Sequence, residues 1–72
     1  KERFMQTYRI RDEFIKLGQA LKSAGFVESG VDAKFAVQDW LVKVNGQVET
    51  ARGKKLVPGD VVEYDGQTLK IE

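Results

Sequence analysis

Seven lysine and arginine side chains between positions 16 and 55 are the residues of this sequence best suited to chemistry. They are Lys16, Lys22, Lys34, Lys43, Arg52, Lys54 and Lys55. Three of them fall within positions 52–55, where neighbouring cations repel one another unless an anion binds. Cations arranged in this way contact the sugar-phosphate backbone of nucleic acids, which supplies most of the binding affinity. The alternative is that they are ordinary surface cations, such as any small soluble protein carries.

The charge is distributed unevenly along the chain. Through Gly59 there are eleven Lys and Arg against seven Asp and Glu, a net charge of +4. From Asp60 onward one Lys stands against four acids, a net charge of −3. The overall charge of +1 is therefore the sum of a basic segment, residues 1–59, and an acidic one, residues 60–72. This division favours a positive surface on one side of the protein.

The composition argues against an enzyme and against a bound cofactor. The chain has no cysteine and no histidine, which removes thiolate and imidazole metal ligands and the commonest general base. The carboxylates are scattered, and no glycine-rich loop is suited to hold a phosphate cofactor. We therefore expect a non-enzymatic protein without a metal, a cofactor or a small-molecule substrate.

The length of 72 residues predicts a single domain spanning 1–72. A chain of this size buries roughly 60% of its unfolded surface, which is enough for one small core. No apolar run approaches the ~20 residues of a membrane span, and no signal-peptide pattern is present. We expect a monomeric cytoplasmic protein that does not contact membranes.

Two amphipathic helices are predicted in the first half of the chain. The first begins near Lys16, and its apolar face comprises Leu17, Ala20, Leu21 and Ala24. Gly25 follows at a position typical of a helix C-terminus, whereas no strong N-cap residue precedes the helix. The second begins after Ser29 and presents Ala33, Ala36, Val37 and Trp40, with Leu41 as a further candidate. The intervening Gly25–Glu28 makes the pair a helical hairpin closed by Phe26 and Val27.

The segment Val42–Val48 is predicted to be a β-arm that turns at Asn45-Gly46. Strand alternation buries Val42 and Val44 and directs Lys43 to solvent. Asn-Gly is the typical pair of a type I′ turn, in which both residues take positive φ. The turn is the first explanation for Asn45, and a nucleic-acid contact from its side chain is the second.

The rest of the chain predicts further strands. Alternation from Phe4 to Ile10 is typical of an N-terminal strand, and Pro58-Gly59 of a type II turn. Val61–Tyr64 and Gln67–Ile71 form a hairpin around Asp65-Gly66. The expected fold class is α+β, with a two-helix hairpin packed on a small, mainly antiparallel β-sheet.

Several segments together resemble the S-four-like RNA-binding domain, which is named after a protein of the small ribosomal subunit. They are Leu17…Leu21, Gly25, Ser29…Ala33-Lys34, Val37, Val42-Lys43-Val44-Asn45-Gly46 and Pro58-Gly59-Asp60-Val61-Val62. The likeness covers residues 15–64 and is strongest to small stand-alone bacterial members. It implies an alpha-L motif, in which two helices and a β-arm form a positive face that grips structured RNA, often ribosomal RNA.

The resemblance also implies roles for single residues. It aligns polar or basic contact positions of the family with Lys16, Ser29, Lys34 and Lys43. Combined with the charge pattern, it predicts an RNA-binding set of Lys16, Lys22, Ser29, Lys34, Lys43, Asn45, Arg52, Lys54 and Lys55. For Ser29 a plain helix N-cap remains the alternative to a phosphate contact at the helix start.

The sequence departs from the family pattern at three positions. Gly30 stands where many members have arginine, and Gly18 where many have an acid. Trp40 replaces the glycine that usually precedes the arm. If that position needs positive φ, Trp40 is strained; otherwise the second helix is one turn longer. As a residue of the helix face, Trp40 is expected to lie in the core, with stacking on an unpaired base as the alternative.

Two functions are consistent with these features. The first is a non-enzymatic module that binds structured RNA, with ribosomal RNA as the expected target. The second is a β-grasp-like protein-interaction or carrier domain without nucleic-acid binding. Sulfur carriers of that kind need a C-terminal Gly-Gly, whereas this sequence ends in Leu69-Lys70-Ile71-Glu72.

Overall fold

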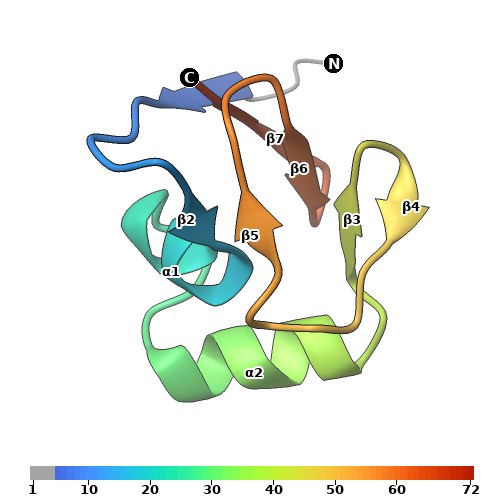
Figure 1. The fold of residues 1–72 in the computed structure, drawn as a ribbon. Coiled ribbons are helices and arrows are strands. Elements are labelled where there is room, and N and C mark those ends of the chain that lie inside the picture. Colours follow the sequence, from blue (N-terminus) through green and yellow to red (C-terminus); the bar gives the residue numbers. More distant parts are fainter. Residues whose placement is uncertain (1–4) are drawn as a thin grey trace.

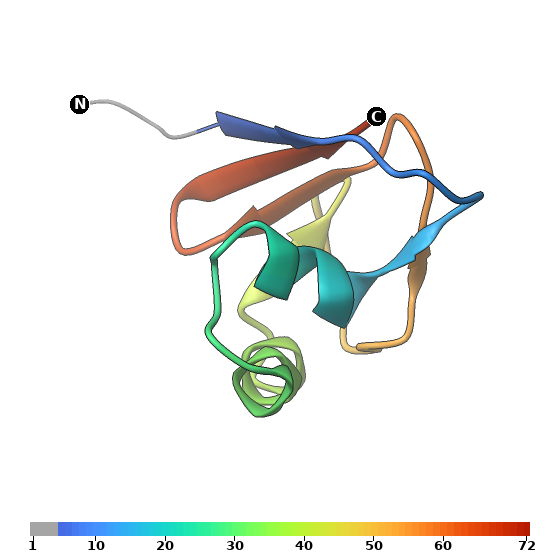
Figure 2. The ribbon, with the colours of Figure 1, turned by 90° about the vertical axis from the view of Figure 1, so that its left-hand side faces the viewer.

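The computed structural model describes residues 5–72, and it is a layer of two helices under a β-sheet (Figures 1 and 2). Within these residues the elements follow one another as β1 (Met5–Tyr8), β2 (Ile15–Lys16), α1 (Leu17–Ser23), α2 (Gly30–Gln38), β3 (Val42–Val44), β4 (Gln47–Val48), β5 (Lys55–Leu56), β6 (Val61–Tyr64) and β7 (Gln67–Ile71). The predicted N-terminal strand is confirmed for Met5–Tyr8 and ends before Ile10, while Phe4 lies outside the described residues.

The main sheet has five strands in the order β1-β7-β6-β3-β4. Its pairs are antiparallel except for β1 and β7, which run parallel and join the two ends of the described chain. Backbone bonds continue this pairing beyond the strands, because Ile10 donates to the carbonyl of Glu72 and Glu72 donates to that of Tyr8. The sheet is therefore mainly antiparallel, as predicted.

A second sheet of two short strands lies apart from the first. Residues of β2 pair antiparallel with β5, so that Ile15 lies opposite Leu56 and Lys16 opposite Lys55. This pairing was not predicted, because both strands are only two residues long and carry no periodic signal. It connects the start of α1 to the segment that follows the arm (Figure 1).

The helices pack under the inward face of the main sheet. Buried side chains come from both helices and from alternate positions of the strands, and they form one core cluster. Its largest fully buried side chains are Leu17, Leu21, Leu56, Leu69, Ile71, Val37, Val42 and Val62. Burying each of these side chains contributes about 1.5–3 kcal/mol, which makes the cluster the main source of stability.

Both helix ends near the interhelical linker form as the sequence predicts. Gly25 follows α1 with φ of 79°, a conformation that glycine adopts without steric cost. Ser29 is the N-cap of α2, and its Oγ accepts a hydrogen bond of 3.2 Å from the amide of Asp32. In the linker Val27 is buried and Phe26 is partly buried, so both contact the core as expected.

The predicted arm and turns are present. Val42 and Val44 are buried and Lys43 is exposed. Asn45 and Gly46 have φ of 54° and 85°, the positive pair that a type I′ turn requires. Gly59 has φ of 103° at the third position of the Pro58-Gly59 turn, which agrees with type II geometry.

The predicted core position of Trp40 is wrong. α2 ends at Gln38, and Trp40 has φ of 65° with 70% of its side chain exposed. Leu41 is also outside the helix and 54% exposed. The chain must reverse after α2 to enter β3, and a left-handed residue at position 40 makes that turn. The family glycine therefore marks a real backbone requirement, which Trp40 meets under strain.

Replacing Trp40 with glycine is expected to stabilise the protein. A left-handed conformation costs a non-glycine residue ~1–2 kcal/mol, and the added chain entropy of glycine offsets part of that gain. We expect Trp40→Gly to raise the free energy of unfolding by about 1 kcal/mol in urea denaturation followed by circular dichroism. Leu41→Gly is the control and should destabilise, because Leu41 is exposed but does not have positive φ. If Trp40→Gly is less stable than the parent chain, the backbone at Trp40 is not strained.

Candidate functional site

The N-terminus of α1 is capped by the backbone of the 51–55 loop. Lys16 at the N-cap position makes no side-chain cap. Instead, the amide of Leu17 donates to the carbonyl of Lys54 at 2.8 Å, and that of Gly18 donates to the carbonyl of Arg52 at 3.0 Å. Two amides that a helix leaves unpaired are thus satisfied by a segment about 35 residues away in sequence. The loop that carries three predicted site cations is fixed against α1.

Close contact between this loop and α1 depends on Gly18. A Cβ atom at position 18 would lie 2.5 Å from Cγ and 3.0 Å from Cδ of Arg52. The contact with Cγ is shorter than Cβ atoms make in proteins, so a side chain at position 18 would require Arg52 to shift. Gly18 is buried in α1 and costs the helix roughly 1 kcal/mol in propensity. This departure from the family pattern makes room for the Arg52 side chain.

A basic hollow forms where α1, the start of α2 and the loop meet. It has a volume of about 430 Å³ and is lined by Lys16, Gly18, Gln19, Lys22, Gly30, Ala33, Arg52 and Gly53. Three of these residues are cations, and none is an acid. The guanidinium of Arg52 also reaches the carbonyl of Gly30 at 3.5 Å, the outer limit of a hydrogen bond. The structure thus brings together three of the predicted residues, Lys16, Lys22 and Arg52.

Two further predicted cations, Lys54 and Lys55, directly follow the lining residues Arg52 and Gly53 in the chain, and we call them the rim of the basic hollow. Lys55 is directly opposite Lys16 across the β2–β5 pair, where like charges are destabilising. The ammonium of Lys55 lies 4.8 Å from the ring centre of Phe14, a cation–π contact that compensates part of this repulsion. Lys54 supplies the carbonyl that caps Leu17, and its side chain is exposed. The hollow and its rim are therefore a concentration of positive charge.

Ser29 and Lys34 border the same region through α2. Ser29 immediately precedes Gly30, and its hydroxyl is engaged as the helix cap. Lys34 is one helical turn after Gly30, on the flank of α2 that faces the hollow, and it is exposed. Both positions are compatible with a contact to a ligand that extends beyond the hollow.

Asn45 holds two turns together. Its side-chain amide donates to Oδ1 of Asp60 at 3.1 Å, while its Oδ1 accepts from the amide of Val61 at 2.9 Å. Oδ2 of Asp60 accepts in turn from the amide of Val57 at 2.9 Å. The side chain of Asn45 is therefore a structural link between the arm and the Pro58-Gly59 turn. An additional RNA contact from Asn45 stays a prediction.

Lys43 is not brought to the basic hollow. It points away from the core on β3, opposite Glu63 on β6 and Val48 on β4. Its nearest surroundings include Glu63, Tyr64 and Asp65. Lys43 and Arg52 line different hollows, so the prediction that a single basic face contains Lys43 and the loop cations is not supported by a shared hollow.

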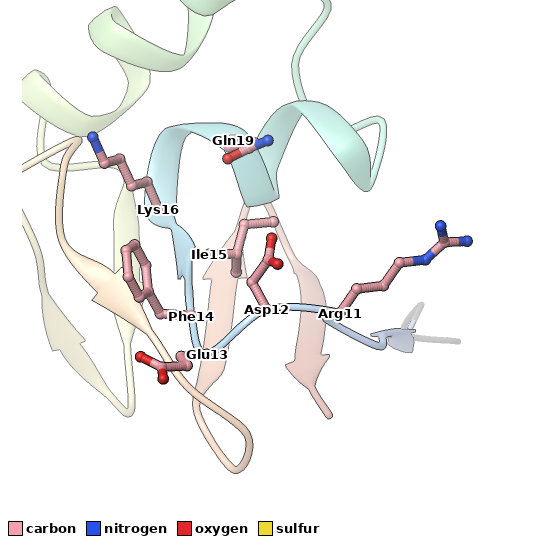
Figure 3. Close-up of a pocket in the computed structure, with 7 residues that line it drawn as sticks. All are labelled: Arg11, Asp12, Glu13, Phe14, Ile15, Lys16 and Gln19. Atoms are coloured by element: carbon pink, nitrogen blue, oxygen red, sulfur yellow. The ribbon is translucent and has the colours of Figure 1, made fainter.

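A larger hollow near β2 offers no comparable arrangement. It has a volume of about 890 Å³ and is lined by Arg11, Asp12, Glu13, Phe14, Ile15, Lys16 and Gln19. Figure 3 shows Arg11 and Lys16 pointing outward in different directions, with Asp12 between them and Glu13 pointing away below Phe14. Its charged groups do not converge on one point, and they include both signs. The basic hollow is therefore the better candidate for a binding site.

The comparisons with known proteins agree with this geometry. A family model described as the S4 domain matches residues 8–72. The chain belongs to the S4 domain family. This confirms the resemblance, and it makes the chain a member of a family of binding modules rather than enzymes.

Two named relatives, one of which also has a solved structure, support the assignment. The chain is 46% identical over 57 residues to the probable ribosome maturation protein RlbA of Bacillus subtilis, covering 79% of this chain and 80% of RlbA. It is 39% identical over 68 residues to the putative RNA-binding protein YbcJ of Escherichia coli, covering 93% of this chain and 97% of YbcJ. The solution structure of E. coli YbcJ, described as having an alpha-L motif involved in RNA binding, superposes with a TM-score of 0.68 at 31% identity. That match covers 99% of this chain and 89% of the other, which confirms the predicted α+β fold.

The set predicted from the sequence lacks five residues that line the basic hollow, namely Gly18, Gln19, Gly30, Ala33 and Gly53. The signal for Gly18 was present, because a glycine in the first turn of a helix weakens it and needs a compensating reason. The carbonyl caps from Arg52 and Lys54 leave no such signal, since any residue supplies a backbone carbonyl.

Gly18→Ala is expected to move the Arg52 side chain while α1 stays folded. Alanine favours the helix by about 1 kcal/mol, but its Cβ forces the arginine side chain off α1. We expect the folded content by circular dichroism to be retained and the NMR signal of the Arg52 Nε–H to shift. The control is Gly30→Ala, because a Cβ at position 30 meets no atom within 4 Å. An unchanged Arg52 signal in Gly18→Ala would contradict the close contact.

Asn45→Gly is expected to destabilise the protein although glycine keeps the positive φ. The substitution removes two side-chain hydrogen bonds and leaves Asp60 with fewer partners, a loss of about 1–2 kcal/mol. Thermal unfolding should therefore occur at a lower temperature than in the parent chain. Gln47→Ala, on the neighbouring exposed strand, is the control and should have little effect. If Asn45→Gly unfolds like the parent, the link between the two turns is unimportant.

Proposed function

We propose that this domain binds structured RNA, with ribosomal RNA as its target, through the basic hollow and its rim. The observation that carries the proposal is the convergence of Lys16, Lys22 and Arg52 on one hollow, whose lining within residues 5–72 includes no acid. A phosphate in this hollow would relieve the repulsion among the cations and gain charge-assisted hydrogen bonds. The names of the relatives support RNA as the ligand and ribosome maturation as the context.

The electrostatic arrangement favours the backbone of a folded RNA over a small anion. The basic hollow alone could accept one phosphate group. Lys55 and Lys54 on one side and Lys34 on the other extend the positive charge well beyond it, as a polyphosphate strand requires. Double-stranded RNA is recognised mostly by shape and by phosphate and 2′-hydroxyl contacts, which suits a rigid basic surface of this kind.

The proposed contacts differ in importance. Lys16, Lys22 and Arg52 bind phosphates directly, and Lys34, Lys54 and Lys55 extend the surface. Ser29, Asn45 and Lys43 are secondary, because the first two side chains are engaged within the protein and the third lies beside Glu63. One copy of the chain is the binding unit, and ribosomal RNA as the target implies action in the cytoplasm.

Charge reversal at the basic hollow is expected to weaken RNA binding and its dependence on salt. In filter binding to purified ribosomal RNA, the logarithm of the association constant should fall with log salt by roughly 0.7–0.9 for each phosphate contacted. Lys16→Glu, Lys22→Glu and Arg52→Glu should each weaken binding and reduce that slope by about 1.

Lys70→Glu is the matched control for these variants. Lys70 is an exposed lysine on β7, away from the basic hollow, so its reversal makes the same change in net charge. If RNA affinity falls equally in Lys70→Glu and Lys16→Glu, the loss comes from the change in overall charge, and the basic hollow is not the binding site. Lys43→Glu, measured in the same series, tests whether the outward face of the arm adds a contact. Absence of measurable RNA binding at low salt would overturn the function itself.

A further inference from the structure

The two flanks of α2 have different chemistry. With 3.6 residues per turn, Gly30, Ala33 and Lys34 fall on the flank next to Arg52 and the basic hollow. Asp32, Ala36 and Asp39 fall on the other flank, with Phe35 at its edge. Figure 2, which looks along α2, shows the linker from α1 beside this helix. The second flank lies away from the proposed RNA contacts.

This second flank borders a separate groove, which we call the acidic groove. It has a volume of about 350 Å³ and is bounded by the interhelical linker, α2 and the end of β6. Three carboxylates line it, those of Glu28, Asp32 and Asp39. Within the described part of the chain no lysine or arginine lines the groove, so its lining is negatively charged.

Apolar side chains line the same groove. Phe35 is 56% exposed and Leu41 is 54% exposed. At the inner side the rings of Phe26 and Tyr64 stack with their centres 6.3 Å apart. Seven large apolar residues are exposed within residues 5–72; Phe35 and Leu41 line this groove, and Trp40 lies beside Leu41 in the chain. Such a concentration on a small protein marks an interaction surface.

Asp39 is placed where it does not help the fold. It is the C-cap residue of α2, and no basic residue lies in the last turn of this helix. A carboxylate at a helix C-terminus is repelled by the negative end of the helix dipole. Trp40 follows it in a left-handed conformation that disfavours tryptophan. Two unfavourable residues in succession at the end of the acidic groove indicate selection for something other than stability.

We propose that the acidic groove binds a segment of a partner protein that carries lysine or arginine together with apolar or aromatic side chains. The partner's cations pair with Glu28, Asp32 and Asp39, and its apolar side chains cover Phe35 and Leu41. Charge complementarity excludes the anionic alternatives, because RNA and acidic lipid would be repelled by the same carboxylates. The domain therefore binds protein on one flank of α2 independently of what it binds on the other.

The probe that tests the proposal is a displayed library of random twelve-residue peptides, selected against the nuclease-treated full chain. We expect the selected peptides to be enriched in lysine or arginine together with leucine or aromatic residues. A synthetic, labelled copy of the strongest peptide should shift the amide NMR signals of Glu28, Phe35 and Leu41 in the parent chain. Its affinity should fall as salt rises.

Variants of the acidic groove separate this binding from a general attraction of charges. Phe35→Ser and Asp39→Asn should each lower the affinity for the labelled peptide at least tenfold. Asp39→Asn should also leave the melting temperature unchanged or slightly raised, which a purely structural aspartate would not do. Val57→Ser is the matched control, because Val57 is a similarly exposed apolar residue outside the groove.

Three results would overturn the proposal. The first is the absence of enriched peptides, or enrichment of peptides that are not basic. The second is binding that Phe35→Ser and Asp39→Asn leave unchanged, which would put the contact elsewhere. The third is sedimentation showing self-association that Phe35→Ser abolishes, since the groove would then be covered by a second copy of this chain. None of these measurements uses RNA, so their failure is distinguishable from failure of the RNA-binding function.

Discussion

The hydrogen bonds from Leu17 and Gly18 to the carbonyls of Lys54 and Arg52 are the contacts on which the basic hollow depends. A seven-residue helix has little stability of its own, and α1 has no side-chain cap to begin it. The 51–55 loop supplies that cap with its backbone. The same two bonds that start the helix therefore fix the loop cations beside Lys16 and Lys22, so the fold and the site share one constraint.

One glycine and one polar pair support this arrangement. Gly18 lets Arg52 lie across the first turn of α1, and the Asn45–Asp60 link holds the arm to the turn that follows β5. Both ends of the segment from Gln47 to Asp60 are thereby tied to the rest of the protein. Backbone hydrogen bonds fix the loop to α1. The cations of the loop therefore stay close to one another despite their mutual repulsion.

Much of the fold could be predicted from the sequence, and the failures have physical causes. Helix periodicity located α1 and α2, while Asn45-Gly46 and Pro58-Gly59 located turns through their restricted φ values. Trp40 was misassigned because periodicity reports which residues could share a face and not where the backbone must reverse. The sequence also predicted which cations are exposed, but the separation of Lys43 from Arg52 depends on which face of the sheet the helices cover.

The parallel pairing of β1 with β7 has a consequence for how the chain reaches this structure. The helix pair and the β6–β7 hairpin are local, and their contacts close short loops. The contact between Ile10 and Glu72 instead closes a loop of about sixty residues, which costs more entropy and makes it a late event. The α1 cap by Arg52 and Lys54 is also long-range. We therefore expect a folding order in which the two helices and the hairpin form first, the basic hollow closes next, and β1 docks last.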